Sequence, residues 1–232
     1  MKRFTVLIGV CLALMVFTPF VFAGEYNIEP GDTITITKGV DKVNRSMEVV
    51  NPELELSAAC RVLGDTGYFT IRGINQWTTQ ELCNDLKVLK SMDIKKVLIY
   101  MNSGGGSAMD GLAVSDLIRI EKNAGVEITV DAYGIVASAA IPIFLSASKR
   151  VASKNTIFMM HPAALWKWGM FSETLKDLDS QREMLIMLRG LYAGIVVENS
   201  NLTKEEMLAM MEKDTWFLAP QAKEWGMIDE IK

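Results

Sequence analysis

The chain has 232 residues, half of which are hydrophobic, and carries a formal net charge of −4. This length suffices for one α/β domain with a full core and a small appendage. A mildly acidic chain without a cluster of lysine and arginine is a poor partner for nucleic acid. The chain has a single histidine, and its cysteines show no metal-ligand spacing. We therefore expect no metal site and no cofactor.

Residues 1–23 have the pattern of an export signal. They begin with Lys2 and Arg3, continue as an apolar run, and end in Val21-Phe-Ala23, the small-residue pattern that signal peptidase accepts. We expect cleavage between Ala23 and Gly24, which moves the net charge to −6 because Lys2 and Arg3 are lost. The mature protein would then be periplasmic or envelope-associated. The alternative is an uncleaved anchor, since about 20 apolar residues can span a bilayer.

Residues 24–57 differ in pattern from the rest of the chain. Thr33-Ile-Thr-Ile-Thr37 alternates like a half-buried strand and is followed by a polar, turn-rich stretch. The segment is either an N-terminal arm or an edge hairpin. After cleavage two cysteines would remain, Cys60 and Cys83. An exported location permits a disulfide between them, but a buried thiol is equally compatible with the sequence.

From residue 58 onward, strand-like and helix-like segments alternate. This alternation predicts a mainly parallel sheet with helical crossovers. The run at 96–101 is nearly all apolar, which is typical of a strand covered on both faces. The expected strands are 68–72, 96–101, 126–130, 150–152 and 156–160, and the expected helices are 78–91, capped by Thr78 or Thr79, 107–123 and 139–147.

The last third of the chain is predicted to be helical. Ser172 would cap a long helix ending near Ser200, with an apolar stripe that includes Leu188 and Tyr192. Other apolar residues lie off that stripe, so the helix is expected to bury two faces, one against its own domain and one against a partner subunit. Thr203-Lys-Glu-Glu206 is a capping box that opens a further helix, expected to end near residues 213–214.

Three short motifs each follow a strand-like run. They are the glycine run Asn102-Ser-Gly-Gly-Gly-Ser107, Ser138 in Gly134-Ile-Val-Ala-Ser-Ala-Ala140, and His161 in Met159-Met-His-Pro162. A serine nucleophile needs a base, and His161 is the only imidazole available. Glycine lets backbone N–H groups approach a substrate closely, as an oxyanion hole requires. Each motif alone has an ordinary structural explanation, such as a helix cap for Ser138.

A fourth motif follows near the C-terminus, Asp214-Thr-Trp-Phe-Leu-Ala-Pro-Gln-Ala-Lys-Glu-Trp-Gly-Met-Ile-Asp229. Together, the four motifs resemble the Clp protease proteolytic subunit (ClpP) family, and the resemblance covers residues 58–232. The resemblance implies an α/β fold, the crotonase-like spiral of β-β-α units, with a long helix that mediates ring stacking. It implies a serine endopeptidase in which Ser138 is the nucleophile, His161 the base and Asp214 the residue that orients the imidazole. The N–H groups of Gly105 or Gly106 and of Ala139 would form the oxyanion hole.

The sequence also departs from the family pattern. Gly104 stands where the family usually has proline, Ala139-Ala140 replaces Met-Gly, and Pro162 follows the histidine directly. An export signal would separate the chain from ATP and from the unfoldase that cytosolic members use. The resemblance therefore implies an ATP-independent peptidase that acts on peptides or unfolded protein. It would be a homo-oligomer, with a ring possible, and would touch the membrane only through residues 1–23 if these are retained.

Two other functions fit parts of the sequence. A serine–lysine peptidase of the signal-peptide-peptidase A kind shares the fold and would use Lys149, Lys154 or Lys176 as its base. A degenerate, non-catalytic module on the same fold would bind peptides or act as a scaffold. If Asp214 is not the third catalytic residue, Asp177, Asp179 and Glu212 are the next acids to test.

Overall fold

The computed structural model describes residues 33–38, 43–48, 55–164 and 173–232. The chain divides into two compact units, residues 1–52 and 53–232. The proposed signal at 1–23 lies outside the described residues. In the first unit, β1 (Thr33–Lys38) and β2 (Val43–Glu48) pair antiparallel as a two-stranded sheet of their own. The segment from 24 to 57 therefore contains a hairpin.

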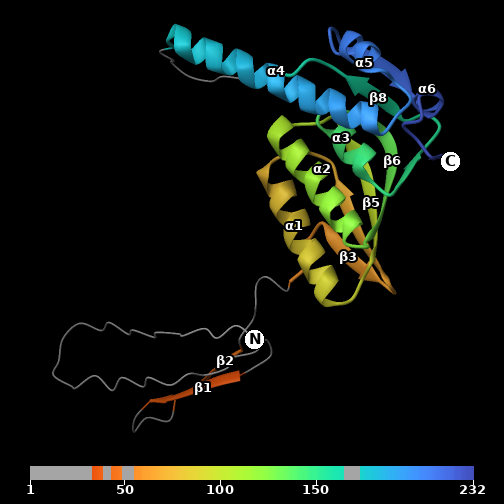
Figure 1. Cartoon of the computed structure of the whole chain (residues 1–232). Coiled ribbons are helices and arrows are strands. Elements are labelled where there is room, and N and C mark those ends of the chain that lie inside the picture. Colours follow the sequence, from red (N-terminus) through yellow and green to blue (C-terminus); the bar gives the residue numbers. More distant parts are fainter. Residues whose placement is uncertain (1–32, 39–42, 49–54, 165–172) are drawn as a thin grey trace. The chain divides into compact units, whose positions relative to one another are not determined.

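The second unit is built around one mixed sheet with helices packed against it (Figure 1). The strand order is β10-β7-β6-β5-β4-β3, and β8 pairs with both β6 and β9. Pairing is parallel except for β3 with β4 and β8 with β9. The strands are β3 (Cys60–Leu63), β4 (Thr66–Ile71), β5 (Lys96–Ser103), β6 (Glu127–Ala137), β7 (Lys149–Ala152), β8 (Ile157–Met160), β9 (Thr215–Leu218) and β10 (Glu230–Ile231).

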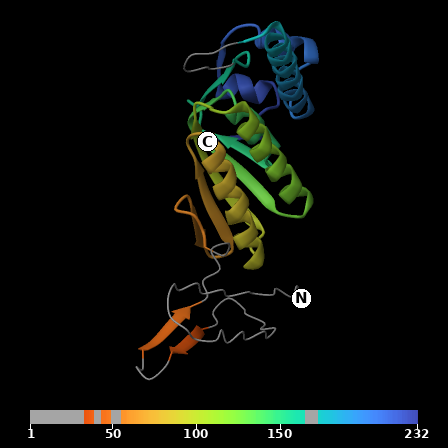
Figure 2. The ribbon, with the colours of Figure 1, turned by 90° about the vertical axis from the view of Figure 1, so that its left-hand side faces the viewer.

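The described residues of this unit include six helices. They are α1 (Gln76–Ser91), α2 (Ala108–Asn123), α3 (Ala140–Ser146), α4 (Leu175–Glu198), α5 (Lys204–Met210) and α6 (Ala219–Glu224). In Figures 1 and 2, α1 and α2 lie side by side on one face of the sheet. The expected α/β fold with β-α alternation and a long helix in the C-terminal half is confirmed.

The strand at 96–101 is not covered on both faces. Burial alternates along β5: Val97, Ile99 and Met101 are buried in the core, whereas Tyr100 on the other face is 36% exposed. The prediction of a doubly covered strand was wrong because an apolar run can hide a two-residue alternation when the outward residues are themselves aromatic or aliphatic.

Two helix caps also differ from expectation. The cap of α1 is Asn75, whose side chain accepts hydrogen bonds from the backbone N–H groups of Trp77 and Thr78. The cap of α4 is Thr174, which forms a capping box with Asp177. Ser172, the expected cap, lies outside the described residues. The capping box at Thr203 and Glu206 is confirmed, although α5 ends at Met210, earlier than expected.

Strand β6 is the element that positions the functional site. Its residues Thr129–Ala132 pair with β7, and its residues Ile135–Ala137 pair with β8. Gly134 lies between these two stretches with φ of 71°, and a Cβ there would come within 2.6 Å of the Asn102 side chain. This glycine therefore lets β6 change partners and carry its last residues to the end of β8.

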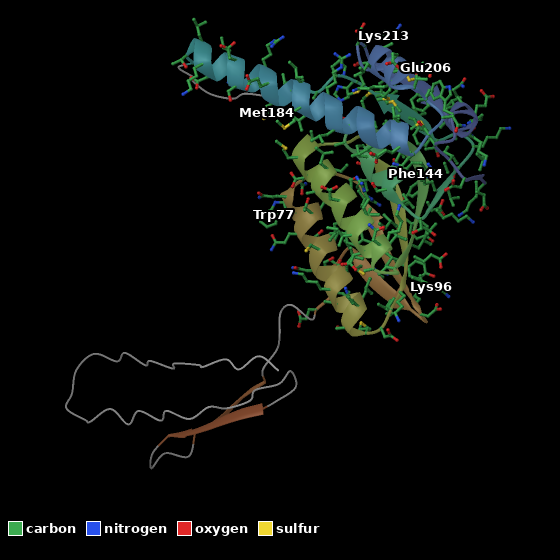
Figure 3. The ribbon with its side chains drawn as sticks, in the orientation of Figure 1. Trp77, Lys96, Phe144, Met184, Glu206 and Lys213 are labelled. Carbon is green, nitrogen blue, oxygen red and sulfur yellow. The ribbon has the colours of Figure 1, made fainter. Side chains whose placement is uncertain are left out.

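A series of aromatic side chains in contact with one another fixes β8 and β9 against the core. Phe144 of α3, labelled in Figure 3, packs edge-on against Phe158 at 5.5 Å between ring centroids. Phe158 stacks on Phe217 at 5.6 Å, and Phe217 meets Trp225 at 4.8 Å. Aromatic pairs of this kind stabilise the fold beyond the contribution of the apolar area that the rings bury. The β8–β9 pair is thus held in place beside α3, the helix that follows Ser138.

Candidate active site

Ser138 lies in the tight turn between β6 and α3, with φ of 55°. This left-handed conformation is strained for a residue with a side chain. The turn is held by backbone hydrogen bonds: the Ser138 N–H donates to the Met159 carbonyl at 2.8 Å, and the Ser138 carbonyl accepts from the Ile141 N–H at 3.0 Å. The strained residue is therefore anchored by β8 on one side and by α3 on the other.

His161 follows β8 directly, and its Nε2 lies 2.6 Å from Ser138 Oγ. The parallel pairing of β6 with β8, in which Ala137 is opposite Met159, carries both strand ends to the same edge of the sheet. Both side chains are half-buried at the edge of one pocket. The structure thus brings together the serine and the imidazole that the sequence singled out.

Asp214 is next to His161 along the paired strands but is not bonded to it. In the antiparallel register of β8 and β9, Met160 is opposite Thr215, so the next residues along are His161 and Asp214. Asp214 is exposed, and within the described ranges no hydrogen bond joins it to the imidazole. Of the other acids considered, Asp177 caps α4 together with Thr174, and Glu212 lies 3.8 Å from Arg189.

The glycine run lies against the serine turn. Gly105 has φ of 99°, and a Cβ there would come within 2.7 Å of the Ser138 Cβ. Gly106 has φ of 151°, and a Cβ there would collide with the Ile74 backbone. Only glycine lets the loop run this close to Ser138 on one side and to Ile74 on the other.

The two oxyanion candidates in this loop are distinguished by their hydrogen bonds. The Gly105 N–H donates to Ser103 Oγ at 3.2 Å, so it is already occupied. The N–H groups of Gly106 and Ala139 donate no hydrogen bond to any residue that the structure describes, and both residues line the pocket that holds Ser138 and His161. This arrangement favours Gly106 over Gly105 as the partner of Ala139.

The pocket beside Ser138 has a volume of about 360 Å³ and is mainly apolar. Besides the residues named above, its lining includes side chains from α2, α3, α4 and the segment after α5: Met109, Leu112, Pro142, Met184, Leu185, Leu188, Tyr192 and Met211. Figure 3 labels Met184 on the side of α4 that faces α2. A pocket of this size and polarity suits one large apolar side chain.

Sequence reasoning missed the contribution of α4 to this pocket. From the sequence, the apolar stripe that includes Leu188 and Tyr192 is expected to serve packing and assembly, not a pocket. Leu188 is buried, and the Tyr192 hydroxyl donates to the Ser138 carbonyl at 3.1 Å. Nothing in the spacing alone tells a packing stripe from a pocket wall, because both need apolar side chains on one helical face.

No lysine takes the place of the imidazole among the described residues. Lys149 pairs with Glu230 at 2.6 Å, and this hydrogen bond raises the pKa of the Lys149 ammonium. A lysine base needs the opposite, a lowered pKa that leaves it neutral near pH 7. Among the residues that the structure describes, no hydrogen bond joins Lys154 or Lys176 to Ser138. This geometry does not favour a serine–lysine dyad.

The described part of the chain holds no cluster of histidine, cysteine and acidic residues that could bind a metal ion. Cys60 and Cys83 are both free thiols, so they form no disulfide with each other. Burial, with a smaller contribution from the nearby Asp85 carboxylate, raises the pKa of Cys60 to about 11. That thiol is therefore unreactive at neutral pH. None of the helices described is long and apolar enough to cross a membrane.

Comparison with known proteins assigns the family. Residues 55–232 match the family model for Clp protease. The chain is 31% identical over 163 residues to the ATP-dependent Clp protease proteolytic subunit 1 of Streptomyces avermitilis, covering 68% of this chain and 71% of that protein. It is 28% identical over 160 residues to the proteolytic subunit 3 of Rhizobium etli, covering 68% of this chain and 79% of that protein.

A solved structure agrees with these sequence matches. A ClpP1 mutant from Listeria monocytogenes superposes with a TM-score of 0.62 at 26% identity, covering 71% of this chain and 90% of that chain. The match with the family model spans the sheet, the serine turn, the histidine and the C-terminal segment described above. On this evidence the chain belongs to the Clp protease family and is a serine peptidase.

Proposed function

We propose that this chain cleaves peptide bonds with Ser138 as nucleophile, His161 as general base and Asp214 as the residue that orients the imidazole. The observation that carries the proposal is the 2.6 Å approach of His161 Nε2 to Ser138 Oγ in a strained turn beside an apolar pocket. A nucleophile within hydrogen-bonding distance of its base is the geometric requirement of covalent serine catalysis.

The reaction proceeds through an acyl-enzyme. Ser138 Oγ attacks the scissile carbonyl carbon while its proton passes to His161 Nε2, which requires the imidazole to carry its other proton on Nδ1. The negative charge that develops on the carbonyl oxygen is stabilised by the N–H groups of Gly106 and Ala139. Nε2 then protonates the leaving amine, and the same steps with water release the acyl group.

Asp214 would complete the triad by accepting a hydrogen bond from His161 Nδ1. Directly opposed residues of an antiparallel pair have Cβ atoms about 4.5–5.5 Å apart, within reach of a carboxylate. The register of β8 and β9 supports this pairing. Because the bond is absent among the described residues, the proposal includes a side-chain adjustment of Asp214 toward the imidazole.

We extend the proposal to location and to independence from ATP. The basic start, apolar core and Val-x-Ala end of residues 1–23 support export, and an exported chain has no access to cytosolic ATP. N-terminal sequencing of the protein from a fractionated cell should give Gly24 as the first residue outside the cytoplasmic membrane. An intact Met1 in the soluble cytosolic fraction would contradict this location.

The substrate would be a peptide or an unfolded segment, cleaved after a large apolar side chain that fills the pocket. The mainly apolar lining of α2, α3 and α4 supports this preference. We also propose a homo-oligomer, supported by the apolar side chains that α4 exposes, among them Leu175 at 81% and Met187 at 65%. A ring is the assembly that the family resemblance favours.

Labelling with a fluorophosphonate probe tests the catalytic proposal. The wild-type protein should be labelled at Ser138, and the label should disappear in Ser138→Ala and in His161→Ala. Label that persists in His161→Ala would instead favour a lysine base. A folded wild-type protein that takes no label would overturn the catalytic assignment.

A further inference from the structure

The Ser138 carbonyl accepts a hydrogen bond from a side chain as well as from the backbone of the turn. Besides the N–H of Ile141, this oxygen accepts a hydrogen bond from the Tyr192 hydroxyl at 3.1 Å. Tyr192 lies on α4, far along the chain from Ser138, so this contact exists only through the tertiary fold. It is the contact by which α4 reaches the strained turn directly.

The phenol of Tyr192 is a dependable donor. Burial raises the pKa of Tyr192, so the hydroxyl keeps its proton throughout the pH range in which a peptidase operates. Its ring lines the pocket together with Leu188, whose side chain has no acceptor, and Met211, whose sulfur is only a weak one. A hydroxyl in such surroundings is held to the acceptor that it has, because leaving that acceptor would cost a buried hydrogen bond.

Peptide geometry links this hydrogen bond to the oxyanion hole. The Ser138 carbonyl and the Ala139 N–H belong to one planar peptide group, in which the C=O and N–H bonds of the trans form point in opposite directions. A donor that fixes the carbonyl from one side therefore fixes the direction of the Ala139 N–H on the other. That N–H donates no hydrogen bond within the described ranges, and Ala139 lines the pocket.

We propose that Tyr192 is a positioning residue for the oxyanion hole: its hydroxyl holds the Ser138–Ala139 peptide so that the Ala139 N–H faces the reacting carbonyl oxygen. The inference rests on the proposed serine-peptidase function and adds a residue to it. Among the described residues, the Tyr192 hydroxyl makes no hydrogen bond to Ser138 Oγ or to the imidazole, so it influences the reaction through the Ser138–Ala139 peptide.

Tyr192→Phe tests this role because it keeps the ring and removes only the hydroxyl. We expect kcat to fall on the order of ten-fold with KM within about two-fold of wild type, since a donor to the oxyanion acts mainly in the transition state. A peptide aldehyde, which forms a tetrahedral adduct with the serine, should lose affinity by the same factor as kcat/KM. Tyr133→Phe, which changes a 39% exposed tyrosine of β6, is the matched control and should leave all three values unchanged.

The alternatives give different results. If Tyr192 is merely structural, Tyr192→Phe lowers the melting temperature but leaves kcat and the aldehyde affinity of the folded protein unchanged, which overturns the proposal. If Tyr192→Phe fails to fold, 3-fluorotyrosine at position 192 provides a stronger donor of nearly the same shape. Unchanged aldehyde affinity in that protein would likewise reject the role. Full activity of Ser138→Ala would instead refute the proposed function, so the two failures are distinguishable.

Discussion

The pocket beside Ser138 and the exposed apolar positions of α4 are both rich in leucine and methionine, yet their surroundings differ. In the pocket, Leu188 is buried beside polar groups that point inward, namely Ser138 and His161. On the N-terminal half of α4, Leu175 and Ile186 are exposed, Ile186 by 54%. The apolar character of a residue favours its burial, but it does not tell whether the residue is buried against substrate, the core or a second subunit.

This comparison changes which residues should report on assembly. The apolar stripe predicted from the sequence suggested Leu188 and Tyr192 as probes of a subunit interface. In the structure, Leu188 lines the pocket and the Tyr192 hydroxyl donates a hydrogen bond to the Ser138 carbonyl. Charged side chains at these two positions would therefore disrupt the site itself. Met187 and Leu191, exposed by 65% and 51%, are the correct probes on the same helix.

The largest effect is expected from the polar pair inside the pocket. Ser138→Ala and His161→Ala should each lower kcat for peptide cleavage on the order of 10³-fold or more, and the double variant should lose little beyond either single one. The reason is that both residues act in the same proton transfer. Steady-state kinetics on a fluorogenic peptide measures this, and additive losses in the double variant would argue against a shared step.

The next largest difference is expected between buried and exposed apolar positions of α4, in their effect on stability. Ile195 is 7% exposed and belongs to the core, so Ile195→Ala should lower the free energy of unfolding by about 2–4 kcal/mol. Met187→Ala, at a 65% exposed position of the same helix, should change it by less than about 0.5 kcal/mol in the isolated subunit. Urea denaturation of both variants makes the comparison, and equal losses would show that Met187 is buried within its own subunit.

Asp214 tests how complete the site is. We expect Asp214→Asn to lower kcat on the order of 10- to 100-fold, because the amide cannot stabilise the imidazolium, while the nucleophile and the oxyanion donors remain. The kinetics of this variant should be compared with those of Glu212→Gln, a matched exposed acid nearby. Nearly full activity of Asp214→Asn together with a dead His161→Ala would leave the dyad intact and reject Asp214 as its third member.

Charges at exposed apolar positions of α4 should act on assembly alone. Met187→Glu with Leu191→Glu should lower the mass of the oligomer because each carboxylate would have to be buried in the interface. Light scattering measures the mass, and an unchanged melting temperature at low protein concentration controls for folding. A wild-type protein that is monomeric at micromolar concentration would refute the proposed oligomer.

The smallest effect concerns the C-terminal segment and is a dependence on pH. Burial raises the pKa of Asp229, but hydrogen bonds from the Arg150 side chain and backbone outweigh it and hold this pKa below the ordinary 3.8. A lowered folded-state pKa gives stability that is present above pH 3.8 and is lost as the pH falls through the folded-state value. Asp229→Asn should therefore destabilise the protein at pH 7 and differ less from wild type near pH 3. Thermal denaturation at both values checks this, and a gap that widens in acid would contradict it.

The sequence by itself determined the fold class and the candidate chemistry. The alternation of strands and helices predicted the mainly parallel sheet, and the capping box at Thr203 set the start of α5. The sequence suggested that Ser138 and His161 act together, because a serine nucleophile needs a base and the chain has only one histidine. Short elements such as β3, β9, α6 and β10 were missed, since two to six residues carry too little periodicity to be recognised.

The tertiary structure alone decided the rest. It placed the glycine run against the serine turn, so closely that a Cβ at Gly105 would come within 2.7 Å of the Ser138 Cβ. It brought Tyr192 to the Ser138 carbonyl and set Asp214 beside His161 without a bond. These relations join residues that are distant in the chain, and they depend on strand register and helix packing. Local sequence patterns carry no information about either.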